Sequence, residues 1–189
     1  MIVILEGPMG SGKTISAIAL AAMEKAKSGK RILSNVHLKE IDHQFFDMND
    51  FIRMVGVDNN DIHDCSIILD EAYAFIDARN SQSSLNKLLS YMVMQSRMRA
   101  VDMYITTQNI DLVDKRLRRS CDVRGICRYN RDRQTCTIML TDLRSGVKRR
   151  VQINANDFFD YIPDESIIMR ENPMERILEN INYNRAQEP

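Results

Sequence analysis

Short, largely apolar runs alternate along the first two thirds of the chain with longer segments whose apolar residues recur at helical spacing. The runs at 2–5, 31–36, 65–70 and 101–108 are typical of strands inside a parallel sheet, buried on both faces. The segments between them are Ala-rich or amphipathic, which predicts helices. These helices are expected at 13–27, 48–55, 83–97 and 110–118. This alternation predicts an α/β fold with a mostly parallel sheet and helices on both faces.

The pattern changes after about residue 120. Three strand-like runs follow at 122–130, 134–142 and 147–153, separated by the short polar turns Asn-Arg-Asp-Arg and Leu-Arg-Ser-Gly. Such turns between strands predict an antiparallel β meander, which we expect to extend one edge of the sheet. Apolar residues at helical spacing over 171–184 predict an amphipathic C-terminal helix.

The length of 189 residues and the composition, 44% hydrophobic and 28% charged, are typical of one globular domain. We expect an α/β core at 1–125, a meander extension at 126–155 and a C-terminal segment at 156–189. No apolar run approaches the ~18–20 residues that cross a bilayer, so we expect no membrane insertion and an intracellular location. The four cysteines form no C-x-x-C pair and are expected as buried thiols.

The charges balance overall, with 26 Lys and Arg against 26 Asp and Glu, but they are unevenly distributed. Residues 97–150 hold 14 of the basic and 6 of the acidic residues, which leaves 12 and 20 for the rest of the chain. This asymmetry fits a basic face for a polyanion, and it also fits a domain whose surface charges merely segregate.

Residues 7–14, Gly-Pro-Met-Gly-Ser-Gly-Lys-Thr, match the phosphate-binding pattern G-x-x-x-x-G-K-[ST] between a predicted strand and a predicted helix. Glycines let the backbone N–H groups approach phosphate oxygens. Lys13 is expected to neutralise the β- and γ-phosphates, and Thr14 to offer its hydroxyl to Mg²⁺. The nucleotide-binding residues predicted here are Gly7, Pro8, Met9, Gly10, Ser11, Gly12, Lys13, Thr14 and Ile15.

Two acids, Asp70 and Glu71, end the apolar run that begins at Cys65. The carboxyl end of a strand is where ligands of parallel sheets bind. Asp70 suits the Mg²⁺ shell, and Glu71 suits activation of a water that attacks the γ-phosphate. The alternative is a strand that simply ends in solvated acids. The adjacent pair favours hydrolysis over a simple kinase.

The next strand ends in Thr106-Thr107-Gln108. A glutamine at this point is suited to hydrogen-bond both the γ-phosphate and the attacking water, and so to sense which nucleotide is bound. The alternative is an ordinary polar strand end.

Several arginines are candidates for contact with phosphate. Arg97 and Arg99 precede the strand of Gln108, where a guanidinium could reach the γ-phosphate held by a neighbouring subunit. A denser cluster could act as that finger instead or contact DNA: Lys115, Arg116, Arg118 and Arg119. A third group surrounds the last hairpin, as a DNA-facing loop or a solvated edge: Arg144, Lys148, Arg149 and Arg150.

Five stretches together resemble one lineage of additional-strand P-loop ATPases, the FtsK–HerA superfamily of DNA pumps. They are GPMGSGKT, SNV, IILDEAY, QSRMRAVDMYITTQ and DLVDKRLRR. The resemblance covers roughly residues 1–125. It is strongest to small viral members, which include the genome-packaging ATPases of icosahedral viruses with an internal membrane and the Zot-like phage morphogenesis proteins.

The resemblance implies a RecA-like fold, ATP and Mg²⁺ as ligands, and a homo-oligomeric ring around double-stranded DNA. It implies Lys13 and Thr14 as phosphate and Mg²⁺ residues, Asp70 and Glu71 as the catalytic acids, and Gln108 as sensor. The trans-acting arginine of the family matches Arg97 or Arg99, with a slight preference for Arg99. The chain shows none of the additional domains of cellular relatives, such as a winged helix, so a minimal viral motor is expected.

The leading hypothesis is an ATPase that drives double-stranded DNA, without sequence preference, into a preformed capsid. This motor is expected in the host cytoplasm, with the viral capsid or its portal vertex as a partner. Alternatives are a Zot-like morphogenesis ATPase, a HerA-type helicase, a P-loop kinase of small molecules and a nucleotide-gated scaffold. The first would usually need a membrane span, and the kinase would be expected to lack Glu71.

Overall fold

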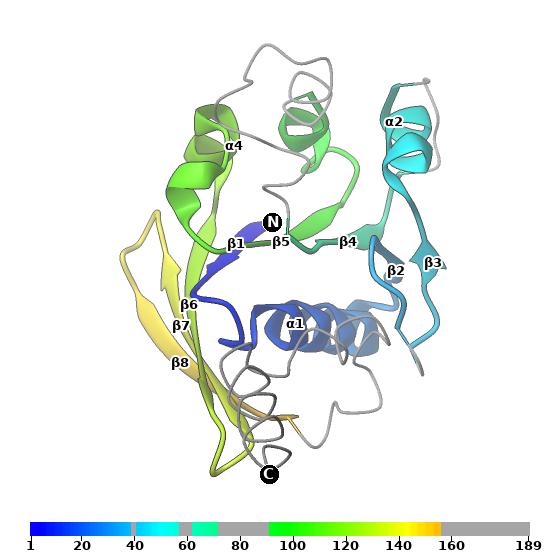
Figure 1. The fold of residues 1–189 in the computed structure, drawn as a ribbon. Coiled ribbons are helices and arrows are strands. Elements are labelled where there is room, and N and C mark those ends of the chain that lie inside the picture. Colours follow the sequence, from blue (N-terminus) through cyan, green and yellow to red (C-terminus); the bar gives the residue numbers. More distant parts are fainter. Residues whose placement is uncertain (39–40, 57–61, 72–90, 156–189) are drawn as a thin grey trace, which may run out of the picture.

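The computed structural model describes residues 1–38, 41–56, 62–71 and 91–155 (Figure 1). Its strands are β1 (Ile2–Glu6), β2 (Arg31–Ser34), β3 (Gln44–Phe45), β4 (Cys65–Leu69), β5 (Asp102–Thr107), β6 (Val123–Asn130), β7 (Thr135–Asp142) and β8 (Lys148–Asn154). Its helices are α1 (Lys13–Ser28), α2 (Met48–Gly56) and α4 (Lys115–Ser120), with the 3₁₀ turn η3 (Ile110–Leu112) and a helical stretch at 91–95.

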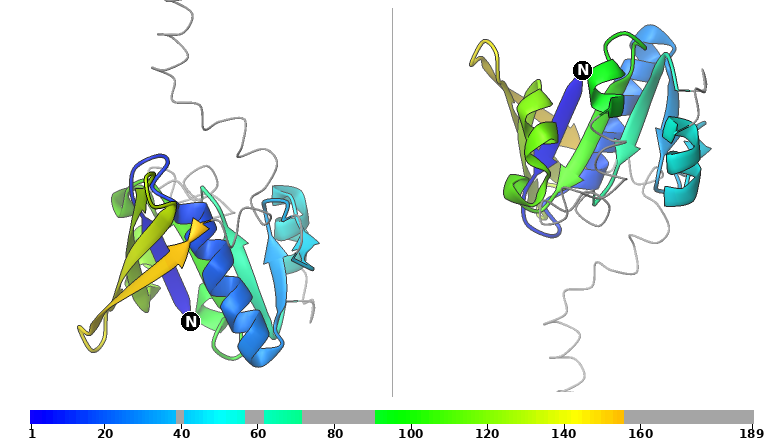
Figure 2. Two further views of the ribbon diagram at one scale, coloured as in Figure 1. Left: turned by 90° about the horizontal axis from the view of Figure 1, so that it is seen from below. Right: turned by 90° about the horizontal axis from the view of Figure 1, so that it is seen from above.

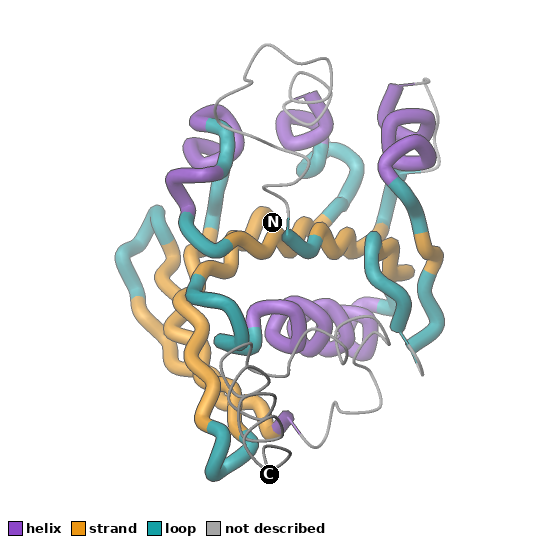
Figure 3. Tube along the Cα trace, in the orientation of Figure 1, coloured by secondary structure: helices purple, strands orange, loops and turns teal. Residues whose placement is uncertain are grey.

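The eight strands of the described residues form one sheet in the order β3-β2-β4-β5-β1-β6-β7-β8 (Figure 3). The strands from β3 to β6 are parallel, and β6, β7 and β8 pair antiparallel as a meander at one edge. Helix α1 covers one face, while α2, α4 and the helix of 91–95 cover the other (Figures 1 and 2). The mostly parallel α/β sheet, its two helical layers and the meander at one edge are thus confirmed.

The apolar strands create two cores, one on each face of the sheet. Every residue of β1, β4 and β5 is buried, because helices cover both of their faces. One core joins the sheet to α2, α4 and 91–95, through Phe51, Val55, Met92, Val93 and Leu117. The other joins it to α1 and to the inner face of the meander, through Ile15, Ile18, Cys127, Cys136 and Ile138. The meander is therefore packed into the domain.

Helix α1 begins and ends where the sequence indicates. Gly29 ends it with a φ of 74° and donates its N–H to the carbonyl of Lys25. The expected helix 110–118 is instead two elements, because Val113 is extended and the carboxylate of Asp114 caps α4 by accepting the Arg116 N–H at 2.8 Å.

The remaining predicted helices lie partly or wholly outside the described residues. Residues 91–95 are helical within the predicted 83–97, whereas 83–90 and the predicted helix at 171–184 lie outside the description. The two-residue strand β3 was not predicted, since it is exposed and pairs only with the end of β2. Within the described residues, no helix has the length and apolar character needed to cross a membrane.

Candidate nucleotide site

The phosphate loop predicted at 7–14 joins the carboxyl end of β1 to α1, at the edge where the parallel strands end. Gly7 and Gly12 have φ angles of 153° and 82°. A Cβ at Gly7 would lie 2.9 Å from the carbonyl oxygen of Cys127. A Cβ at Gly12 would lie 2.3 Å from Cys136 Sγ. Because these cysteines belong to β6 and β7, the meander forms one wall of the loop.

Lys13 and Ser11 show that the loop fits an anionic ligand. Lys13 is 8% exposed, and its Nζ donates to the carbonyl of Pro8 at 3.0 Å, so the ammonium lies against the loop. Ser11 Oγ is buried and has no hydrogen-bond partner among the described residues. A buried unpaired hydroxyl costs about 1–3 kcal/mol. A phosphate oxygen at the helix N-terminus would satisfy it.

The other predicted loop residues differ in exposure. Met9 is exposed at 69% and Gly10 is exposed beside it, so the tip of the loop faces solvent. Ile15 is 3% exposed and packs in the core of α1, away from the solvent.

Thr14 and Asp70, the two residues predicted to hold Mg²⁺, contact each other directly. The hydroxyl of Thr14 lies 2.9 and 3.0 Å from the two carboxylate oxygens of Asp70. Both supply hard oxygen ligands, and Mg²⁺ in nucleotide sites needs only one or two protein groups besides phosphate and water. Within the described part of the chain, no group of three or more His, Cys, Asp or Glu side chains is placed to hold a metal ion. The residues therefore fit a magnesium site of this minimal kind.

Glu71, the predicted base, has an exposed side chain and a φ of 51°. Its N–H donates to Thr106 Oγ1 at 2.8 Å, and that hydroxyl lies 2.7 Å from Asp70 Oδ1. The side chain of Asn35 accepts the Asp70 N–H at 2.8 Å and donates to the Asp70 carbonyl at 3.0 Å. Sequence reasoning gave no individual role to Asn35 or Thr106. The available signal was that both are polar residues at the ends of buried strands.

Gln108 is exposed and comes directly after β5. Its neighbour Thr107 pairs with Glu6, the last residue of β1, so Gln108 lies at the edge that carries the phosphate loop. Glu6 is 8% exposed and was also missed by sequence reasoning. Its carboxylate accepts from Arg124 Nε at 2.7 Å and from the Ile110 N–H at 3.2 Å, which ties β1 to β6 and to η3.

Arg97 and Arg99 lie before β5, at the amino ends of the parallel strands, whereas the phosphate loop lies at their carboxyl ends. The six residues of β5 make five steps of ~3.3 Å, so roughly 17 Å separates the two ends of this strand. Arg97 Nη2 donates to Asp122 at 2.8 Å, and Arg99 Nε donates to Gln95 at 3.2 Å. The structure therefore does not bring either arginine into the phosphate site of its own chain.

The basic cluster of α4 lies on the sheet face opposite α1 (Figure 1). Lys115, Arg116 and Arg119 are exposed, while Arg118 is half-buried and pairs with Asp111 at 2.7 Å. These cations lie outside the phosphate loop of their own chain, so they remain candidates for contact with another molecule.

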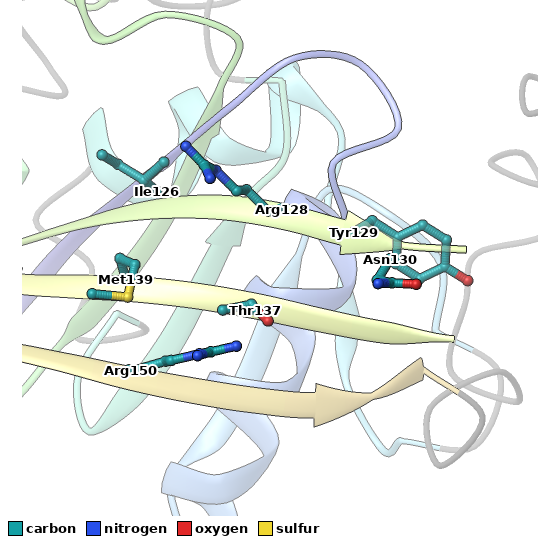
Figure 4. Close-up of a pocket in the computed structure, with 7 residues that line it drawn as sticks. All are labelled: Ile126, Arg128, Tyr129, Asn130, Thr137, Met139 and Arg150. Atoms are coloured by element: carbon teal, nitrogen blue, oxygen red, sulfur yellow. The ribbon is translucent and has the colours of Figure 1, made fainter. Parts of the chain in front are cut away.

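The last hairpin places its basic residues on both faces of the meander. Lys148, Arg149 and Arg150 are all exposed. Arg150 pairs with Met139, which pairs with Ile126, and these three share the outer face, away from the phosphate loop. A concavity of about 590 Å³ lies there, lined by Ile126, Arg128, Tyr129, Asn130, Thr137, Met139 and Arg150 (Figure 4). Sequence reasoning missed Arg128.

A glycine-rich loop between β1 and α1, with an acid pair at the end of β4, defines a RecA-like P-loop NTPase fold. The family model of zonular occludens toxin (Zot) matches residues 1–154, and the chain belongs to that family. This confirms the resemblance, which included Zot-like proteins. No curated protein matches the chain.

Solved structures share this fold at low sequence identity. The N-terminal domain of zonular occludens toxin from Neisseria meningitidis is 17% identical, with a TM-score of 0.54 over 80% of this chain and 92% of that one. The genome packaging NTPase B204 from Sulfolobus turreted icosahedral virus 2, in complex with ATP-gammaS, is 13% identical, with a TM-score of 0.59 over 79% and 95%. The DNA-packaging ATPase B204 from Sulfolobus turreted icosahedral virus is 13% identical, with a TM-score of 0.56 over 79% and 95%.

Proposed function

We propose that this protein is an ATP-hydrolysing motor of virus or phage morphogenesis that moves double-stranded DNA. The observation that carries the proposal is the contact of Thr14 with Asp70, beside a loop that holds Lys13 and next to the acid Glu71. This is the donor set that P-loop enzymes use for a nucleotide with Mg²⁺. Fold similarity to NTPases, including one named for genome packaging, supports it.

In this proposal each residue acts from the position that the fold gives it. The loop N–H groups, Ser11 and Lys13 bind the phosphates, and Thr14 with Asp70 would hold Mg²⁺, which neutralises charge on the phosphates when bound. Glu71 takes a proton from the attacking water as general base. Gln108, at the same edge, hydrogen-bonds the γ-phosphate and that water.

We propose further that the active form is a homo-oligomeric ring. An arginine beside Lys13 would add to the stabilisation of charge on the transferred phosphoryl group, and P-loop enzymes often receive it from another protein. Because Arg97 and Arg99 lie at the ends of the strands opposite to the phosphate loop of their own chain, either would act on the site of a neighbouring subunit. Ring closure would place one such arginine at each junction.

The proposed DNA contact uses the outer face of the meander, where the side chains of Arg128, Lys148 and Arg150 are exposed. The twelve described strand positions that share this face by register include no acid. Their cations suit the phosphate backbone, so binding should be independent of sequence and weaken with salt. We propose that the DNA enters a capsid or its portal vertex, and that the motor works in the host cytoplasm.

The test is the rate of ATP hydrolysis with and without double-stranded DNA, together with the mass of the assembled species. We expect Mg²⁺-dependent hydrolysis that DNA accelerates, abolished by Lys13→Ala. Arg128→Glu with Arg150→Glu should remove the acceleration, whereas the control Arg53→Glu, on an exposed helix position, should keep it. Hydrolysis that DNA never accelerates would leave the ATPase assignment standing and overturn the DNA motor.

Family membership favours a second candidate, a Zot-type morphogenesis ATPase that works on phage assembly rather than on packaging. Both candidates hydrolyse ATP, so only the response to DNA separates them. Unwinding of a forked duplex, measured by strand separation, would instead indicate a helicase.

A further inference from the structure

The Asp70–Glu71 dipeptide is held from both sides by polar side chains of the two neighbouring strands. In the sheet, β4 lies between β2 and β5. Asn35 follows β2, and Thr106 belongs to β5. Each strand therefore supplies one side chain to the point where the chain leaves β4 and presents the two acids.

Asn35 satisfies both backbone groups of Asp70. Its amide oxygen accepts the N–H at 2.8 Å and its Nδ2 donates to the carbonyl at 3.0 Å. An amide side chain offers one acceptor and two donors, so Asn35 replaces the strand partner that β4 loses at its end. Aspartate in this place could accept but not donate.

Thr106 joins the two acids through one hydroxyl. It is fully buried, donates to Asp70 Oδ1 at 2.7 Å and accepts the Glu71 N–H at 2.8 Å. One hydroxyl has one donor and two acceptor sites, so both bonds form at once. The adjacent Thr107 is equally buried, but its hydroxyl donates to the Asn109 carbonyl at 2.9 Å instead of to an acid.

The hydrogen bond from Glu71 stabilises a backbone conformation that glutamate rarely adopts. A φ of 51° lies in the left-handed region, which is strained for a residue with a side chain. The bond to Thr106 acts on the peptide group just before that φ rotation, so it sets the direction in which the Glu71 carboxylate leaves the chain.

We propose that Thr106 is a positioning residue that couples the Asp70 carboxylate to the backbone of Glu71, with Asn35 holding Asp70 from the other side. This inference rests on the proposed role of Glu71 as the base. Without the Thr106 hydroxyl, Glu71 relaxes out of its left-handed conformation, and its carboxylate leaves the line of the attacking water. Nucleotide binding continues, because Lys13 and the loop are unchanged.

Thr106→Val, which keeps the shape and removes the hydroxyl, tests the proposal against Thr106→Ser and the matched control Thr107→Val. Residues that position a catalytic group typically account for about 10–100-fold in activity. We expect kcat to fall by about 10–100-fold in Thr106→Val with KM and the Kd of a fluorescent ATP analogue changed by less than about 3-fold. Thr106→Ser should restore most of kcat, and Thr107→Val should keep it.

Hydrogen exchange at the Glu71 amide gives a second readout that needs no activity. We expect faster exchange of the peptide that carries Glu71 in Thr106→Val and in Asn35→Asp, and wild-type exchange in Thr107→Val, with all four proteins folded by circular dichroism. Unchanged exchange in Thr106→Val would overturn the inference, as would a loss of kcat matched by an equal loss of nucleotide affinity. A wild-type protein that hydrolyses no ATP would overturn the proposed function instead, while the exchange result still decides the role of Thr106.

Discussion

Asp102 illustrates at the scale of single residues how a buried charge is stabilised. Its carboxylate accepts from Lys30 Nζ at 2.6 Å and from the terminal ammonium of Met1 at 2.7 Å, and its side chain is 10% exposed. Burial alone would raise the pKa of Asp102, but the hydrogen bonds from Lys30 and the terminal ammonium outweigh it, so the pKa is lowered. The ion pair thus contributes stability above the ordinary pKa of an aspartate, and this is lost as the pH falls through the lowered pKa.

Asp102→Asn should lower the free energy of unfolding at pH 7 by about 3 kcal/mol, because it leaves Lys30 without its buried partner. The difference from wild type should shrink as the pH falls below about 4, the ordinary pKa of an aspartate, and should vanish only below the lowered pKa of folded Asp102. Urea denaturation at both pH values measures this. Asp42→Asn, which breaks the exposed pair with Lys25, should change stability by no more than about 1 kcal/mol at either pH.

Glu71→Gln separates nucleotide binding from hydrolysis. The amide keeps the size of the side chain but accepts no proton from water, so kcat should fall by about 100-fold or more. The Kd for ATP should stay near the wild-type value, since Glu71 lies outside the phosphate loop. Phosphate release measures kcat, and equilibrium binding measures the Kd for ATP. Wild-type turnover in this variant would remove Glu71 from the mechanism.

The phosphate-loop motif was enough to predict Lys13 and Thr14, and the acids that end a strand predicted Asp70 and Glu71; the structure brings Thr14 and Asp70 into contact. Asn35 and Thr106 were not singled out because their importance depends on which strands flank β4. That order joins segments far apart in sequence, which local patterns do not encode. Positions alone also left Arg97 and Arg99 undecided, and both lie away from the site of their own chain.

At the scale of elements, the meander shapes the phosphate loop. Cys136 of β7 lies against Gly12, and Cys127 of β6 lies against Gly7. Burial raises the pKa of the Cys127 thiol, more than the Ser16 hydrogen bond and the Lys13 charge lower it, so this part of the wall stays neutral. The three strands of the meander were predictable from their alternation and turns. Their packing against the loop was not, because alternation shows which residues face inward but not what they contact.

Gly12→Ala should weaken nucleotide binding, because the new methyl would lie 2.3 Å from Cys136 Sγ and force the loop to shift. Gly29 is a matched control: its φ of 74° resembles the 82° of Gly12, but apart from its chain neighbours no described heavy atom lies within 4 Å of its Cβ position. Gly29→Ala should therefore cost about 1–2 kcal/mol of stability, the cost of a left-handed conformation for a residue with a side chain, and leave the Kd for ATP unchanged. We expect at least a tenfold weaker Kd for Gly12→Ala, partly restored by Cys136→Ala; equal effects of both alanines would contradict a contact-based cause.

At the scale of the whole molecule, the two ends of the parallel strands carry different parts of the proposed site: the phosphate loop at one end and the arginines at the other. In mixtures with wild type, Arg97→Ala or Arg99→Ala subunits should suppress hydrolysis more steeply than their fraction, since each variant subunit disables a neighbour's site and, in a ring whose sites act in turn, a disabled site stalls the others as well. The steady-state rate against mixing ratio measures this. Arg53→Ala, on α2, serves as the control and should leave the rate unchanged. A loss proportional to the fraction for both arginines would argue for independent sites.

The place of β1 in the sheet also sets the order in which this chain can fold. Ile2 pairs with Met103 and Val3 with Val123, so both neighbours of the first strand are synthesised about a hundred residues after it. Closing such long loops slows folding, and until then the ribosome-bound chain exposes the four apolar residues at 2–5. The wall of the phosphate loop is later still, because Cys136 belongs to the seventh strand. A nascent chain should therefore acquire nucleotide affinity only once the meander has emerged from the ribosome. ATP binding would then be one of the last properties that the chain gains during its synthesis.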